Sequence, residues 1–227
     1  MFVAKTAIAR SALLAPRLAR LRHHGSVLGS GTEVVIEGFP RSGTSFAVAA
    51  FRRAQGRSVE VACHVHAPAQ IVEGVRRSLP VMLIVRDPEA TTVSFAIRNP
   101  ELTLRQALRA YLRFHEPLVA LRDRVVVGRF DEVTVDLGAV IDRVNQRFGT
   151  SFARFEQTPE AVASVFAEID EDYAKRLSGE SFERAVARPS ERRDALKPQL
   201  EAAYRAADLA SLRSRAERAF ARLTADA

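Results

Sequence analysis

Short runs of β-branched residues alternate with longer stretches of helical periodicity from Thr32 onward. Four such runs, each followed by a polar or Gly/Pro-containing turn, occupy residues 33–37, 59–63, 81–85 and 125–129. Short apolar runs separated by helical segments are typical of a parallel sheet whose crossover connections are helices. The pattern therefore predicts an α/β chain with a three-layer αβα fold around a central parallel sheet.

Helical periodicity is clearest in three later segments. Apolar residues recur at helical spacing in residues 104–118, 137–148 and 209–223, which predicts amphipathic helices that pack against the sheet. His115 lies on the apolar stripe of the first segment. A histidine in such a place is usually a satisfied core residue, so we assign it no chemical role.

No strand pattern follows Gly149. An acidic helical region, residues 160–172, is followed by a basic one, residues 184–197, and this change of charge is compatible with a segment that covers a substrate. With 227 residues, 47% of them hydrophobic, the chain can bury a core of its own. We therefore expect residues 32–227 to form a single domain.

Charge and cysteine content narrow the choice of function less than the pattern does. The formal net charge of +7 favours an anionic partner without choosing among nucleotide, polysaccharide, nucleic acid and membrane surface. Cys63 is the only cysteine, so an internal disulfide is excluded and a thiolate metal site would lack its second sulfur. A reducing compartment follows most simply, and we expect a cytoplasmic protein.

The first 31 residues form a basic segment. They contain no Asp or Glu, and five Lys or Arg residues alternate with leucines. An ordinary N-terminal helix, a transit peptide and an amphipathic helix on a membrane surface all have this composition. We expect the ordinary helix, and contact with a membrane surface stays an alternative.

The first predicted strand leads into a loop with the features of an anion site. Residues 38–46 have the sequence GFPRSGTSF and precede an apolar helical segment. Backbone N–H groups at the start of a helix point toward a bound phosphate, and Gly43 permits a close approach of the backbone. Ser42, Thr44 and Ser45 could also be simple helix caps, which is compatible with phosphate binding.

The loop lacks one residue that ATP chemistry needs. Its glycine spacing is that of the nucleotide-binding GxxxxGK[ST] loop, yet Thr44 occupies the position of the lysine. That lysine neutralises the terminal phosphates in kinases and ATPases, which also need an aspartate for magnesium. Asp87 is the best candidate for that aspartate, but Arg86 separates it from the strand. A divergent P-loop kinase therefore stays an alternative.

Two motifs in order resemble the sulfotransferases that use 3′-phosphoadenosine-5′-phosphosulfate. Residues 40–46, PRSGTSF, resemble the family's 5′-phosphosulfate loop, and residues 83–88, LIVRDP, resemble its second motif, with Ser94 eight positions after Arg86. The resemblance extends over roughly residues 32–155. It implies the P-loop sulfotransferase fold and transfer of a sulfuryl group to an acceptor hydroxyl or amine without a metal. The residues implied for the 5′-phosphosulfate are Arg41, Ser42, Gly43, Thr44 and Ser45, with Arg41 also serving catalysis, and those for the 3′-phosphate are Arg86 and Ser94.

The same resemblance suggests a catalytic base. Many cytosolic members have Lys-Thr-His-Leu-Pro after the second strand, where this chain has His64-Val65-His66-Ala67-Pro68. His66 matches the family histidine and His64 replaces the lysine, which leaves open which histidine acts. A histidine suits a base because its usual pKa near 6.5 lets it accept a proton at neutral pH.

Later matches are less specific. Residues 130–133, FDEV, resemble the family's Tyr/Phe-Glu-Asp-Leu segment, and residues 145–149 resemble a helix end found in many members. A basic segment often completes the 3′-phosphate site near the C-terminus of the family, so Arg192, Arg193 and Lys197 are candidates, with a solvated helix start as the alternative.

Partners follow from these motifs. We expect a sulfonucleotide donor and a hydroxyl- or amine-bearing acceptor that the sequence does not identify. A non-catalytic basic protein that binds nucleic acid or another polyanion is the alternative from a different class, although we do not expect a nucleic-acid partner. The oligomeric state has no sequence signal.

Overall fold

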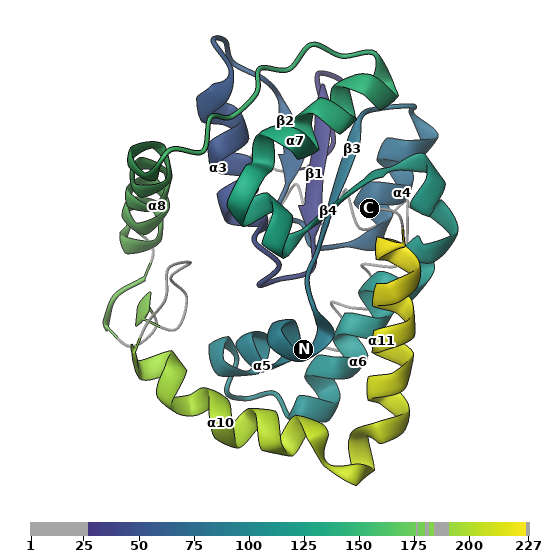
Figure 1. Cartoon of the computed structure of the whole chain (residues 1–227), viewed down its shortest axis with the longest axis vertical. Coiled ribbons are helices and arrows are strands. Elements are labelled where there is room, and N and C mark those ends of the chain that lie inside the picture. Colours follow the sequence, from purple (N-terminus) through teal and green to yellow (C-terminus); the bar gives the residue numbers. More distant parts are fainter. Residues whose placement is uncertain (1–26, 176, 180–181, 184–190, 226–227) are drawn as a thin grey trace.

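Four parallel strands form the centre of the computed structural model, which describes residues 27–175, 177–179, 182–183 and 191–225 (Figure 1). The sheet has the order β2-β1-β3-β4, and each neighbouring pair is parallel. The four predicted strands are confirmed, although three of them begin one or two residues later than expected. The strands are β1 (Val34–Gly38), β2 (Val61–Cys63), β3 (Val81–Val85) and β4 (Val126–Arg129).

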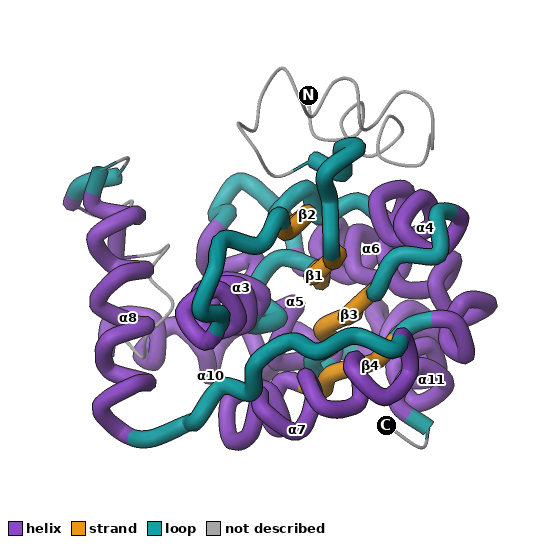
Figure 2. The backbone as a smooth tube through the Cα atoms, turned by 90° about the horizontal axis from the view of Figure 1, so that it is seen from above, coloured by secondary structure: helices purple, strands orange, loops and turns teal. Residues whose placement is uncertain are grey.

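Helices cover both faces of the sheet, so the α/β architecture with a parallel sheet between helical layers is confirmed. One face carries α3 (Thr44–Ala54), α7 (Phe130–Phe148) and α8 (Pro159–Ala174). The strands lie in a row between this layer and the opposite one in Figure 2. The opposite layer consists of α4 (Pro68–Arg76), α5 (Pro88–Arg98), α6 (Leu104–His115), η1 (Glu116–Arg124), α10 (Glu191–Arg205), η2 (Ala207–Leu209) and α11 (Ala210–Thr224).

Burial on both faces explains the continuous apolar strands. Val34 and Ile36 of β1 pack among α3 and α7, while Val35 between them packs against the opposite helical layer. Each fully buried aliphatic side chain of this kind contributes about 1.5 to 3 kcal/mol. An alternating strand would leave one helical layer without an apolar surface to cover.

Local sequence signals fix several helix ends. Thr103 and Gln106 form a capping box at the start of α6, and α7 ends at Gly149, whose φ of 66° places it in the left-handed region. The helix predicted from residue 137 begins earlier, at Phe130. It contains a kink at Asp136, where the side chain accepts a hydrogen bond from the amide of Ala139 and starts a second helical segment.

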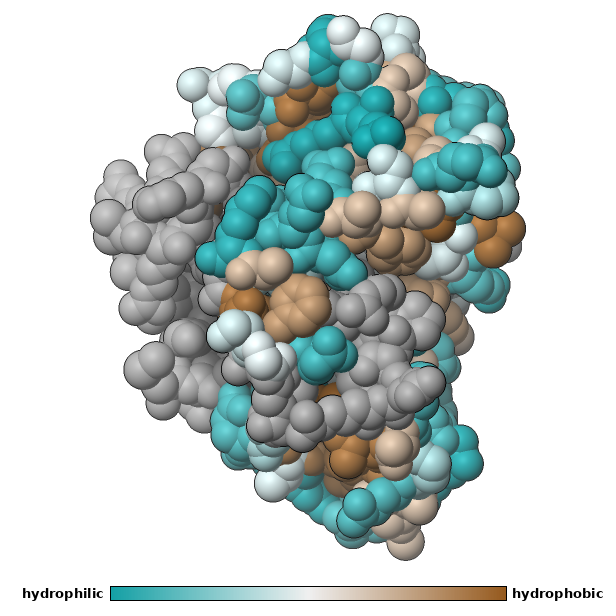
Figure 3. Space-filling model, turned by 90° about the vertical axis from the view of Figure 1, so that its left-hand side faces the viewer, coloured by the Kyte–Doolittle hydropathy of each residue, from teal (hydrophilic) through white to brown (hydrophobic). Residues whose placement is uncertain are grey.

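Some predictions fall outside the described residues. Outside the description lie residues 1–26 of the basic N-terminal segment and residues 184–190 of the basic region. The acidic helical region is α8, and no strand occurs after Gly149 among the residues that the structure describes. Within the same residues no helix is both long and apolar enough to cross a membrane. The face that carries α8 mixes hydrophilic residues with smaller hydrophobic areas (Figure 3).

Candidate functional site

The carboxyl ends of all four strands bring the candidate residues to one edge of the sheet. The phosphate loop follows β1, residues 64–66 follow β2, Arg86 follows β3, and Phe130 follows β4. Because β2 lies on one side of β1 and β3 on the other, the order of the sheet reverses direction between β1 and β3. Ligands of open parallel sheets bind outside the strand ends at such a switch point.

The phosphate loop ends in a helix start that no side chain caps. Gly43 is the N-cap residue of α3, adopts φ 89°, and has no side chain to accept a hydrogen bond from the first amides of the helix. The first turn carries no acidic residue. The first amides of a helix have no partner within the helix, and the helix dipole favours an anion beside them. This end of α3 therefore has the electrostatics of an anion site.

Two hydroxyl groups of the loop are buried without a hydrogen-bond partner. Ser42 is fully buried and Thr44 is 4% exposed, and neither Oγ of Ser42 nor Oγ1 of Thr44 makes a hydrogen bond within the described residues. Capping does not explain the loop hydroxyls, since neither they nor Ser45 cap α3. Buried polar atoms without a partner are rare in native proteins, and a bound anion is one way to satisfy them.

The loop and the second motif meet through two hydrogen bonds. The Nε of Arg41 donates to the Oγ of Ser94 at 3.0 Å, and the guanidinium of Arg86 donates to the carbonyl oxygen of Arg41 at 3.0 Å. Arg41 has φ 74°, a left-handed conformation that is unfavourable for a side-chain-bearing residue. The sequence predicted separate roles for Arg41 and Ser94, and the structure brings them into direct contact.

Two aromatic residues position Arg86. Its guanidinium stacks over the ring of Phe130 at 4.0 Å from the ring centre, and the hydroxyl of Tyr111 donates to its carbonyl oxygen at 3.0 Å. Stacking on an aromatic ring fixes the plane of a guanidinium and so the directions in which its N–H groups point. Sequence patterns placed Tyr111 on a predicted helix without a role at the site, and Phe130 in a segment whose role was not specified.

His66 lies beside the phosphate loop with one ring nitrogen held. Its Nδ1 is 2.7 Å from the carbonyl oxygen of Gly38, and its side chain is 30% exposed. A carbonyl oxygen can only accept, so Nδ1 carries the hydrogen and Nε2 is the basic nitrogen of the neutral ring. The His64 ring lies 5.8 Å from it, centre to centre.

Comparison with known proteins adds nothing to the geometry of this site. The chain matches no family model, no curated protein and no solved structure.

Helix α8 brings a tyrosine to the loop that sequence patterns did not single out. The hydroxyl of Tyr173 is 3.4 Å from the Oγ of Ser45, and Arg98 lies 5.7 Å from the centre of its ring. Burial would raise the pKa of the Tyr173 phenol, but hydrogen bonds from Ser45 and Arg98, with the charges of Arg98 and Arg41, lower it. Arg98 follows Ser94 by one helical turn on α5, a spacing that could have indicated it.

Four remaining candidates lie elsewhere, or their side chains are outside the description. Arg192 and Arg193 belong to α10, but their side chains are not among the described ones. Lys197 forms an ion pair with Asp194 on the exposed side of the same helix. Asp87 accepts a hydrogen bond from the amide of Ala90 and so caps α5. The described part of the chain contains no cluster of three His, Cys, Asp or Glu residues arranged to hold a metal.

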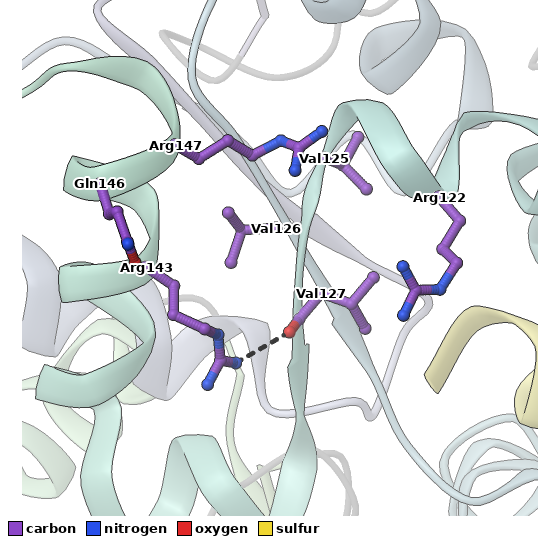
Figure 4. Close-up of a pocket in the computed structure, with 7 residues that line it drawn as sticks. All are labelled: Arg122, Val125, Val126, Val127, Arg143, Gln146 and Arg147. Carbon is purple, nitrogen blue, oxygen red and sulfur yellow. Dashed lines mark hydrogen bonds between the residues drawn. The ribbon is translucent and has the colours of Figure 1, made fainter. Parts of the chain in front are cut away.

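A separate cavity of about 300 Å³ opens at the free edge of β4, away from the phosphate loop. Valines 125 to 127 form its floor, with Arg122 on one side of the strand and Arg143 and Arg147 on the other (Figure 4). Arg143 donates to the carbonyl oxygen of Val127 and forms an ion pair with Glu132. The residues of the candidate site, at the carboxyl ends of the strands, do not line this cavity. Its volume alone therefore does not make it a better candidate for the functional site.

Proposed function

We propose that the chain is a sulfotransferase that moves a sulfuryl group from 3′-phosphoadenosine-5′-phosphosulfate to an acceptor hydroxyl or amine. One observation carries the proposal. The lysine-free phosphate loop and the Arg86 motif lie together at the switch point of the sheet, where Arg41 contacts Ser94 and Arg86 contacts the Arg41 backbone. This pair of anion-binding elements suits a nucleotide that carries two separate anionic groups.

The residues present fit such a donor. The uncapped start of α3, with the unpartnered hydroxyls of Ser42 and Thr44, supplies donors for the 5′-phosphosulfate. Arg86 and Ser94 supply the donors for a 3′-phosphate, and the flat guanidinium favours two parallel hydrogen bonds to it. Arg41 contacts both elements, through its Nε to Ser94 and its carbonyl oxygen to Arg86, and would add positive charge beside a bound donor.

His66 removes the acceptor's proton in this proposal. The acceptor oxygen or nitrogen forms a bond to sulfur while the bond from sulfur to the bridging oxygen breaks, and 3′,5′-adenosine bisphosphate leaves. The acceptor's proton passes to Nε2 of His66, the nitrogen that carries no hydrogen when Nδ1 donates to Gly38. Arg41 and the loop amides stabilise the charge on the leaving oxygen.

The kinase alternative has less support from this site. Thr44 stands where a kinase loop has the lysine for the terminal phosphates, and one carboxylate oxygen of Asp87 accepts the hydrogen bond that caps α5. The polyanion alternative does not account for the buried loop hydroxyls or the held His66 ring.

A thermal-shift titration separates the three functions. The sulfotransferase predicts stabilisation by 3′,5′-adenosine bisphosphate without magnesium, the kinase predicts stabilisation by ATP with magnesium, and the polyanion binder predicts neither. Stabilisation by magnesium and ATP alone would replace the proposal. A screen of carbohydrates, lipid head groups and small metabolites with isotopically labelled donor, followed by mass spectrometry, would then identify the acceptor.

A further inference from the structure

Glu37 is a fully buried carboxylate at the end of β1, and the reaction described above leaves it without a role. Its two oxygens accept hydrogen bonds from the backbone amides of Val65, His66 and Gly38 and from the side chain of Gln70. Every one of these partners is a donor. These donors favour the ionised form of the carboxyl, and burial opposes it.

The hydrogen bonds join Glu37 to the loop that carries both histidines. His64 has φ 60° and His66 has φ 53°, so two residues with side chains adopt the left-handed conformation within three positions. Such residues persist only where the surrounding structure holds them. The amides of Val65 and His66 end on the same carboxylate, which is how the loop is held in this conformation.

The same carboxylate lies beside the ring of His66. Its Oε2 is 3.7 Å from Nδ1, on the side of the ring where Nδ1 donates to Gly38. When the ring takes up a proton at Nε2, a positive charge forms next to this buried oxygen. An opposite charge within about 4 to 6 Å favours the charged form of a titratable group.

We propose that Glu37 is the positioning residue of the His66 base, which aims the ring at the phosphate loop and stabilises its protonated form. The inference rests on the proposed function, since it gives His66 the role of base. It requires a carboxylate at position 37 rather than any hydrogen-bonding side chain of that shape. An amide could accept from the loop, but it carries no charge to stabilise the imidazolium.

Because this carboxyl is buried, its ionisation depends on whether the ring of His66 is protonated. Burial raises the pKa of the Glu37 carboxyl to about 8, against the effect of the N–H donors that surround it. While the ring is neutral, a carboxyl with this pKa holds a proton at pH 7, and a protonated ring favours its ionised form, so Glu37 and His66 titrate as a coupled pair. Glu37 from β1 and His64, which lies on the same loop as His66, both face the ring of His66. Their contributions to the pKa of that ring must therefore be measured separately.

NMR titration of His66 in the nucleotide-free protein tests this inference. We expect Glu37→Gln to move the midpoint of the His66 titration to lower pH by about one unit or more, and Gln70→Met to leave it within a few tenths of a unit. Gln70→Met is the matched control because it disturbs the same network and keeps the charge. His64→Ala measures the contribution of the neighbouring ring, and His66→Ala assigns the resonance.

An unchanged midpoint in a folded Glu37→Gln variant would overturn the inference. If that variant does not fold, the unmodified protein still decides the matter through its ring nitrogen shifts: neutral His66 must carry its hydrogen on Nδ1, and a hydrogen on Nε2 would overturn the inference. No nucleotide enters this experiment. Failure of the donor proposal would appear separately, as a folded protein that does not bind 3′,5′-adenosine bisphosphate.

Discussion

Position 38 has no room for a side chain. A Cβ there would lie 2.6 Å from the carbonyl oxygen of Ile84 and 2.8 Å from the Oγ1 of Thr44. Backbone and loop hydroxyl approach this closely because β1 and β3 meet where the phosphate loop begins. The glycine is thus required by packing as well as by anion binding.

Gly38→Ala should destabilise the protein by about 1 to 3 kcal/mol, the usual range for overpacking a tight site. Urea unfolding measures the change. Gly56→Ala is the control, since a Cβ at position 56 would meet nothing within 4 Å. Equal stability of the two variants would show that β1 and β3 are not packed as described.

His66→Ala should separate chemistry from binding. Affinity for 3′,5′-adenosine bisphosphate should stay nearly unchanged, because that nucleotide offers no proton to remove, while turnover falls by about 10² to 10⁴. Calorimetry and rate measurement with an acceptor from the screen provide the two values. A dead His64→Ala beside an active His66→Ala would move the role of base to His64.

The loop residues could be found from sequence because their signal is local. Glycine spacing, the missing lysine and the Arg86 to Ser94 interval all lie within short segments. The partnership of Glu37 with His66 joins residues 29 positions apart on different strand ends, and that of Ser45 with Tyr173 joins residues 128 apart. Residues so far apart in the sequence leave no local pattern, so the sequence did not predict a role at the site for Glu37 or Tyr173.

Helix α5 connects the second motif to the rest of the site. Asp87 caps it, Pro88 occupies its first turn, and Ser94 and Arg98 lie one turn apart on it. Its orientation therefore decides where Ser94 meets Arg41. In this arrangement Asp87 accepts a hydrogen bond from Ala90, which an uncharged acceptor of the same shape can also do.

Replacement of Asp87 tests that distinction. Asp87→Ala should cost about 1 kcal/mol of stability through loss of the cap, whereas Asp87→Asn keeps an acceptor and should cost less. Binding of 3′,5′-adenosine bisphosphate to Asp87→Asn should equal that of the unmodified protein by calorimetry. Loss of a magnesium-dependent nucleotide affinity in Asp87→Asn would favour the kinase instead.

Strands were easier to predict than helices. The β-branched runs are buried on both faces and so stand out as continuous apolar segments. Helices α4 and α5 are short, and apolar periodicity did not predict separate bounds for them. The kink at Asp136 depends on a side chain that competes with the backbone for hydrogen bonds, which apolar periodicity does not reveal.

At the scale of the whole molecule, a parallel sheet between helices could be predicted, but the strand order could not. The order β2-β1-β3-β4 depends on crossovers that pack on both faces of the sheet. The predicted core position of His115 is confirmed: the residue is fully buried between Tyr111 and Phe114, and its Nδ1 lies 2.9 Å from the carbonyl oxygen of Tyr111. Its Nε2 makes no hydrogen bond within the described residues. Burial lowers the pKa of His115 to about 4.

His115 should make the folded chain sensitive to acid. Its pKa is about 6.5 in the unfolded chain and about 4 in the folded one, so the unfolded state binds more protons between these values. Stability is therefore lost as pH falls below 6.5, by about 2 kcal/mol at pH 5 for this group alone. His115→Phe should lose less stability than the unmodified protein between pH 8 and pH 5 in urea unfolding. Equal losses would contradict a buried neutral His115.

Calorimetry with two nucleotides distinguishes the proposed donor from an ordinary adenine nucleotide. Without magnesium, 3′,5′-adenosine bisphosphate should bind more tightly than AMP by about 1.5 to 3 kcal/mol, or more than tenfold, because Arg86 and Ser94 bind the 3′-phosphate. Arg86→Gln should remove this preference, whereas Arg109→Gln, which replaces an exposed arginine of α6, should keep it. Equal affinities of the unmodified protein for the two nucleotides would contradict the proposed donor.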